Sequence, residues 1–94
     1  MNQCPIHANA FAEKMCEHLK QSKSVLRSLR LMKDEASGDA RIFFLAIIVQ
    51  IESGATLSES LRTASIFDEH SLGIIEKHEK DHRYLEAFQT LSQK

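Results

Sequence analysis

The chain has 94 residues, with 12 lysines and arginines against 13 aspartates and glutamates, and a net charge of −1. This length suits a single domain over residues 1–94 with one core. The near-neutral charge excludes a general attraction for nucleic acid, and three glycines and one proline favour helices over a strand-rich fold. Two cysteines and no apolar leader indicate a reducing, cytoplasmic compartment and not a secreted disulfide scaffold.

The first expected helix begins after an irregular arm over residues 1–7, where Pro5 disfavours helix in the residue before it. Apolar residues then recur at three- and four-residue spacing until residues 21–24 interrupt the pattern. Ser24 is placed to cap a second helix, because its side-chain oxygen can accept from a free N–H group of the first turn. The residues expected to face the core are Phe11, Met15 and Leu19 in the first helix and Val25, Leu26, Leu29 and Met32 in the second.

The central stretch over 41–61, RIFFLAIIVQIESGATLSESL, contains eight consecutive apolar residues. A helix that is apolar nearly all round is usually buried, so we expect a helix that ends near residue 53 to lie at the centre of the domain, with Ile47 and Ile48 buried. A buried parallel strand is the alternative, which the length of the apolar pattern disfavours. The run is far short of the roughly 20 apolar residues that cross a bilayer.

A glycine turn and three more helices are expected after the central one. Gly54 can take the left-handed conformation that closes a helix. Thr56 and Glu59 form the reciprocal pattern of a capping box, which opens a helix over 57–64. The last two helices are expected from Asp68 to about residue 81, and then through the apolar positions Tyr84, Phe88 and Leu91. The sequence therefore predicts an all-α domain, a six-helix antiparallel bundle built from helical hairpins.

One string of residues has the pattern of a zinc hydrolase. His78, Glu79 and His82 spell H-E-x-x-H, by which a helix presents two histidines to zinc and a glutamate to the attacking water. That chemistry also needs a third protein ligand and a cleft that excludes water, whereas Lys80 and Asp81 favour a solvated turn. We therefore expect a binding module with no catalytic residue and no cofactor, and with His78 and His82 only as adventitious metal ligands. A small metal-dependent hydrolase is the alternative.

A second group of potential metal ligands lies near the start of the chain. Cys4, His7, Cys16 and His18 have a spacing that matches no zinc finger or ribbon. Cys16 adjoins the apolar stripe of the first helix, where a cysteine behaves as a small hydrophobic residue. We expect Cys16 in the core.

Each predicted hairpin carries a signature that resembles one family. The first reads like F-x-x-x-L-x-x-L-L-x-A-G-x-P-L-x-x-A-L, at Phe11, Met15, Leu19, Ser22, Leu26 and Leu29. The second reads like S-G-x-S-L-S-E-A-L, at Ser53, Gly54, Thr56, Leu57, Ser58, Glu59, Ser60 and Leu61. The third follows G-E-x-S-G-x-L-x-x-x-L-x-x-L, at Glu79, Asp81, Tyr84, Phe88 and Leu91. In this order, over residues 8–93, the chain resembles the cytoplasmic domain of the inner-membrane platform proteins of type II secretion and type IV pilus assembly, the F-protein family.

The resemblance implies a bundle of six antiparallel helices on the cytoplasmic face of the bacterial inner membrane. In that family the domain helps to couple an assembly ATPase to the polymerisation of pilins or pseudopilins, with other inner-membrane components of the machine as partners. A membrane helix follows the domain, so we expect the sequence to be part of a longer protein. The chain departs from the family at Lys23, Val25, His78 and His82, which replace turn glycines and a proline. An unrelated helical adaptor is a further alternative.

The partner-binding residues are expected on charged helix faces. Arg27, Arg30 and Lys33, with Lys20 and Lys23 upstream, form a local basic face that suits an acidic partner or an anionic lipid.

Weak self-association as a homodimer is also expected. The exposed apolar patch that mediates it is placed where the first and last hairpins meet. The semi-polar side chains of His78, His82 and Tyr84 are expected at the rim of this interface.

Overall fold

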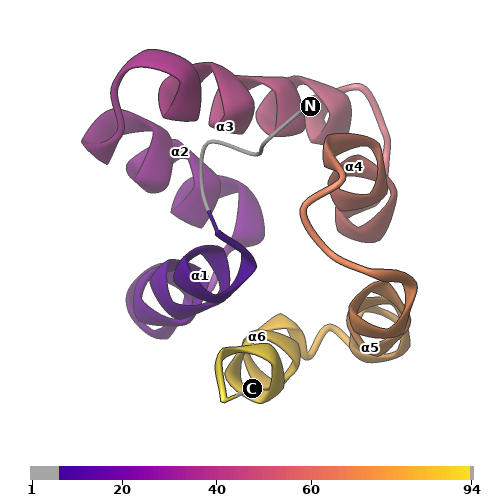
Figure 1. The fold of residues 1–94 in the computed structure, drawn as a ribbon. Coiled ribbons are helices and arrows are strands. Elements are labelled where there is room, and N and C mark those ends of the chain that lie inside the picture. Colours follow the sequence, from indigo (N-terminus) through magenta and orange to yellow (C-terminus); the bar gives the residue numbers. More distant parts are fainter. Residues whose placement is uncertain (1–6, 94) are drawn as a thin grey trace.

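The computed structural model describes residues 7–93, which fold into six α-helices (Figure 1). No strand forms in this range, and no helix in it has the length and apolar character that a bilayer span requires. The predicted all-α class is confirmed, and each helix ends within about two residues of its predicted bound. The helices are α1 (Ala8–Ser22), α2 (Val25–Glu35), α3 (Gly38–Glu52), α4 (Leu57–Ala64), α5 (Glu69–Glu79) and α6 (Tyr84–Ser92).

The helices follow one another around a shared core (Figure 1). Each helix packs against the next one in the chain, as hairpins do, and α1 packs extensively on α6 to close the circle. In the view of Figure 1, α3 lies lengthwise along one edge, whereas α4, α5 and α6 are seen nearly end-on. The closure brings α1 and α6 side by side, so the first and last hairpins share one seam.

Local hydrogen bonds fix where several helices begin and end. The side chain of Ser24 accepts from the N–H of Arg27 at 3.2 Å, as predicted. The predicted capping box is present, with Thr56 Oγ1 accepting from the N–H of Glu59 at 3.1 Å and the Glu59 carboxylate accepting from the N–H of Thr56 at 2.9 Å. Hydrogen bonds to its charged form lower the pKa of Glu59. Gly54, with φ of 110°, closes α3.

Phe11 is at the centre of the core. It is fully buried, and its ring centroid lies 5.8 to 6.3 Å from those of Phe43, Phe44, Phe67 and Phe88. Aromatic rings at these separations attract one another beyond the effect of burial alone. Phe11 thereby joins α1 to α3, to the segment before α5 and to α6. The centre of the domain is an aromatic cluster around Phe11 of α1, to which the central helix of the sequence contributes Phe43 and Phe44.

The position of α3 corrects one sequence-based prediction. Ile47 and Ile48 are buried, with 1% and 5% of their surface exposed, as predicted. Ile42 and Val49, however, are 65% and 57% exposed, because α3 lies at the edge of the domain between α2 and α4 (Figure 1). Six helices arranged around one core can each bury only one face, so a helix that is apolar all round leaves apolar residues outside.

Candidate functional site

The H-E-x-x-H string does not lie on one helix. α5 ends at Glu79, residues 80–83 form a turn, and His82 takes a left-handed conformation with φ of 59°. A zinc hydrolase of this type needs its two histidines one turn apart on a continuous helix, so the string lacks the geometry of such a site. His78 Nδ1 instead lies 2.8 Å from the carbonyl oxygen of Ile74 in its own helix.

Glu79 connects the end of α5 to the start of α4. Its carboxylate accepts from Ser58 Oγ at 2.6 Å and from the Ser58 N–H at 3.3 Å. Ser58 lies in the first turn of α4, where free N–H groups and the helix dipole favour a negative charge. The carboxylate that the motif would assign to catalysis is therefore a contact between two helices.

We expect Glu79→Ala to lower the free energy of unfolding by about 1.5–3 kcal/mol, the range for hydrogen bonds to a charged group. Glu79→Gln keeps an acceptor oxygen, so its free energy of unfolding should fall by less than that of Glu79→Ala. Urea unfolding measures both variants, and Glu76→Ala is the matched control, because Glu76 forms only an exposed ion pair with Arg62. Equal urea midpoints for Glu79→Ala and Glu76→Ala would contradict the structural role of Glu79.

The four possible metal ligands near the start of the chain do not converge in the described residues. Cys16 is in the core, as predicted, and burial raises the pKa of its thiol. His7 is exposed before α1, and His18 Nε2 lies 3.1 Å from Glu35 Oε1. Cys4 lies outside the described residues, and over residues 7–93 no three histidine, cysteine or acidic side chains are grouped so that they could hold a metal ion.

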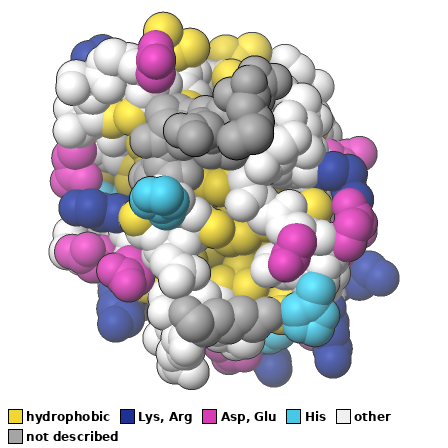
Figure 2. Space-filling view, in the orientation of Figure 1, with side chains coloured by type: hydrophobic (Ala, Val, Ile, Leu, Met, Phe, Trp, Pro, Cys, Tyr) yellow, Lys and Arg dark blue, Asp and Glu magenta, His cyan; other side chains and the backbone are white. Residues whose placement is uncertain are grey.

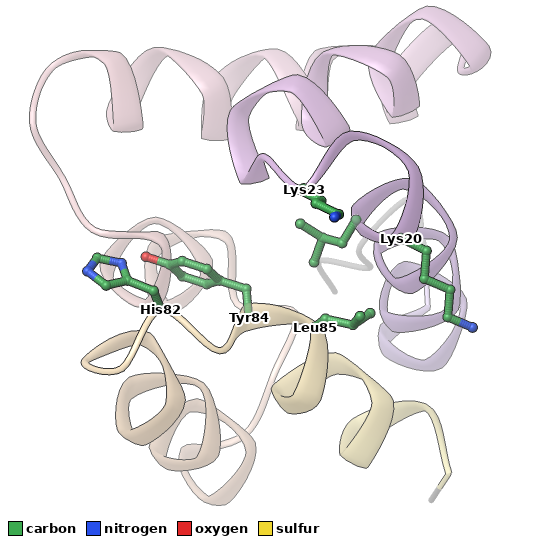
Figure 3. A pocket seen from close by; sticks show the side chains of 6 residues that line it. Lys20, Lys23, His82, Tyr84 and Leu85 are labelled. Carbon is green, nitrogen blue, oxygen red and sulfur yellow. The ribbon is translucent and has the colours of Figure 1, made fainter.

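A hollow of about 350 Å³ lies between the end of α1 and the turn from α5 to α6 (Figure 3). We call it the basic hollow. Figure 3 shows Lys20 and Lys23 on one side and His82, Tyr84 and Leu85 on the other, with the ammonium group of Lys20 pointing outward. The residues that line it are Leu19, Lys20, Lys23, His82, Tyr84 and Leu85.

Tyr84 lines the basic hollow, and Figure 3 shows its hydroxyl group pointing toward His82 and away from the two lysines. Tyr84 is partly buried, and this burial, with a smaller effect of the charge on Glu79, raises the pKa of its phenol. The phenol therefore remains protonated at neutral pH and can donate a hydrogen bond. An acidic ligand in the basic hollow would meet the two lysines and the apolar surface of Leu19 and Leu85.

Three basic residues around the α1–α2 turn have no acidic partner among residues 7–93: Lys20, Lys23 and Arg27. Lys20 and Lys23 line the basic hollow, and Arg27 lines a second depression beside Gln21 and Ser22. A charge without a partner in its own chain keeps its full attraction for an opposite charge on another molecule.

The other predicted partner-binding residues divide into two groups. Arg30 and Lys33 form ion pairs within the chain, with Glu52 at 2.5 Å and Asp34 at 3.3 Å, respectively. His82 and Tyr84 line the basic hollow, whereas His78 is engaged by its own helix. The sequence placed the lysines and the pair His82 and Tyr84 on separate surfaces, and the packing of α1 on α6 brings them together.

Lys23 and His82 share an unusual backbone conformation. Both lie in the left-handed region, with φ of 58° and 59°, and both line the basic hollow. They are also two of the residues that replace a turn glycine of the family that the chain resembles, so the turns keep a glycine-like geometry without glycine. The sequence did not predict a site shared by these two turns.

The geometry of the basic hollow suits the binding of an acidic group next to an apolar one. Its lining residues come from two segments about 60 positions apart in the chain, which the packing of α1 on α6 joins. No protein-family model matches this chain, and neither the curated proteins nor the solved structures contain a match.

Proposed function

We propose that the chain is a protein-docking domain of an inner-membrane platform, of the kind that serves type IV pilus assembly or type II secretion. The machine is taken from the resemblance of the three hairpins, and the docking surface from the basic hollow. The domain acts at the cytoplasmic face of the bacterial inner membrane, where it helps to transmit the work of an assembly ATPase to pilin or pseudopilin polymerisation. Its contribution is binding, with no covalent step.

The second hairpin supports the family assignment. Its resemblance is the most specific of the three, and its residues have the local roles that such a signature requires. Gly54 closes α3 with a positive φ, and Thr56 and Glu59 cap α4 reciprocally.

The observation that carries the docking site is that Lys23 and His82, two of the three non-glycine residues with positive φ among residues 7–93, line one hollow. A non-glycine residue in the left-handed region costs on the order of 1–2 kcal/mol, and such residues gather at functional sites, where the surrounding structure maintains them. Glycine at either position would avoid the strain but would remove a cationic or polar side chain from the hollow. We infer that the side chains of Lys23 and His82 take part in binding.

The charge of the basic hollow indicates an acidic partner segment. A volume of about 350 Å³ admits one or two side chains, and pockets for small ligands begin near this size. We propose that an aspartate or glutamate of the ATPase contacts Lys23 while a neighbouring apolar side chain contacts Leu19 and Leu85. Because the cations are exposed at the rim, the affinity should fall as salt screens them.

Lys23→Gly tests the proposal without the risk of unfolding. Glycine adopts a φ of 58° without strain, so we expect this variant to be more stable than the wild type by about 1 kcal/mol. Because it lacks the ammonium group, we expect it to bind the purified assembly ATPase of the same organism at least fivefold more weakly in titration calorimetry. The double variant Lys20→Glu/Lys23→Glu should bind still more weakly.

The matched control is Lys77→Glu. Lys77 is exposed on α5 and does not line the basic hollow, and its substitution lowers the charge by two, one more than Lys23→Gly does. Its affinity should be within about twofold of wild type at 150 mM salt. An ATPase that binds wild type and Lys23→Gly equally would refute the basic hollow, and one that does not bind the wild type would refute the platform assignment.

A further inference from the structure

An exposed apolar stripe runs along the outer face of α3. It consists of Ile42, Leu45, Ala46 and Val49, whose spacing of three and four residues places them on one side of the helix. Figure 2 shows hydrophobic side chains gathered at the upper edge of the molecule, where α3 lies in Figure 1. Single exposed apolar residues are ordinary, whereas a continuous stripe marks a surface that another molecule covers. We call it the α3 stripe.

Opposite charges lie at the two ends of the α3 stripe. Arg41 stands at one end and Glu52 at the other, and both are exposed. They are separated by about three turns at roughly 3.6 residues per turn, so both lie on the same flank of the stripe. Arg41 has no ion-pair partner among residues 7–93, and Glu52 pairs with the exposed Arg30.

We propose that the α3 stripe binds the α3 stripe of a second copy of this chain, antiparallel about a two-fold axis. An axis that passes between Leu45 and Ala46 sets Ile42 of each copy against Val49 of the other. The rotation reverses the direction of the helix and sets each flank of one copy against the same flank of the other. Position 41 of one copy then faces position 50 of the other, so Glu52 lies two positions, about 3 Å along the helix, from the point opposite Arg41. The two long side chains can span this offset, so Arg41 of each copy can pair with Glu52 of the other. A parallel two-fold pair would instead place this flank of the two copies on opposite sides of the seam, so Arg41 and Glu52 of different copies would not meet.

This self-complementarity is what a second copy requires. In a two-fold interface the same patch serves both partners, so every attraction occurs twice and the patch must complement itself. The α3 stripe meets that condition both in its apolar residues and in its flanking charges. An unrelated partner would not require Arg41 and Glu52 to lie on one flank at opposite ends.

The dimer should be weak. The α3 stripe consists of four side chains on a helix of 15 residues, and it is small beside the roughly 800 Å² per partner of a standard interface. We therefore expect a dissociation constant of about 10 μM or higher, and mostly monomer in dilute solution.

The location differs from the one that the sequence predicted. The apolar side chains at the seam of α1 and α6, among them Phe11, Met15 and Phe88, are buried inside one chain. That seam therefore exposes no large apolar patch for a dimer. Among the described residues, the large apolar side chains that are exposed are Leu31, Ile42, Leu45 and Val49, on α2 and α3.

Sedimentation equilibrium from micromolar to millimolar protein gives the first test. Leu45→Glu should raise the dissociation constant at least tenfold, because it places two like charges beside the two-fold axis, and its circular dichroism should match wild type since Leu45 is 40% exposed. Ala10→Glu, which adds the same charge on an exposed position of α1, should dimerise as wild type does. A wild-type protein that stays monomeric at 1 mM, or a dimer that Leu45→Glu leaves intact, would overturn the proposal.

A charge exchange tests the antiparallel geometry. Arg41→Glu and Glu52→Arg should each weaken the dimer about threefold or more, and the double variant should recover most of the wild-type affinity. Arg41 and Glu52 are about three helical turns apart within one chain, so recovery can come only from contact between copies. A double variant as weak as the single variants would overturn the antiparallel arrangement. None of these results depends on the ATPase, so they can be separated from the test of the basic hollow.

Discussion

We expect Phe11→Ala to lower the free energy of unfolding by about 3–5 kcal/mol, the usual cost of removing a buried phenylalanine ring. Phe11 is fully buried and contacts four other aromatic rings. Its loss leaves a cavity that borders α1, α3, α6 and the segment before α5, and these elements cannot all move inward at once. A domain of this size has roughly 5–15 kcal/mol of stability in total, so this substitution removes a large part of it.

Thermal unfolding measures the effect. For a domain of this size 1 kcal/mol corresponds to about 4–8 °C, so the midpoint should fall by roughly 12 °C or more. Phe11→Leu keeps most of the side-chain volume, so its unfolding midpoint should fall clearly less than that of Phe11→Ala. A Phe11→Ala midpoint within about two degrees of wild type would show that the aromatic cluster does not hold the helices together.

Ile48→Ala should lower the free energy of unfolding by about 2–5 kcal/mol. Val49→Ala, at the next position, should change the free energy of unfolding by less than about 0.5 kcal/mol. The two residues are neighbours in an unbroken apolar run, but Ile48 is buried and Val49 points outward. Ile48 packs into the core beside other apolar side chains, and its truncation creates a cavity. Truncation of Val49 removes atoms that are already in contact with water.

Urea unfolding at micromolar protein compares these variants where dimerisation contributes little. The difference between them measures which face of α3 is buried. If Ile48→Ala and Val49→Ala lowered the free energy of unfolding by similar amounts, α3 would be buried on both faces, as the run of apolar residues alone suggested. That result would also remove the basis for the α3 stripe.

The H-E-x-x-H string shows the limit of a short pattern. Three specified residues over five positions say which side chains are present but not whether the helix continues through them. Here α5 ends at Glu79, and the carboxylate of Glu79 is held by Ser58, 21 positions earlier in the chain. Only the packing of α5 against α4 brings these two residues together.

The sequence by itself determined where the helices begin and end. Ser24, Gly54 and the pair Thr56 and Glu59 act through hydrogen bonds and backbone angles that span no more than about four residues. Such interactions are the same wherever the helix finally packs. Ile47 and Ile48 could also be assigned to the core. Every face of α3 is apolar, and one face of the helix has to be buried.

The tertiary structure alone decided which residues of α3 are exposed. It also decided which distant segments form the basic hollow. Burial of one face of α3 depends on where α2 and α4 lie, and the local sequence of α3 is apolar in every direction. The basic hollow depends on the closure of α1 onto α6, which joins Lys23 to His82 across most of the chain. Both follow from the way six helices share one core, and no spacing within a single segment encodes that arrangement.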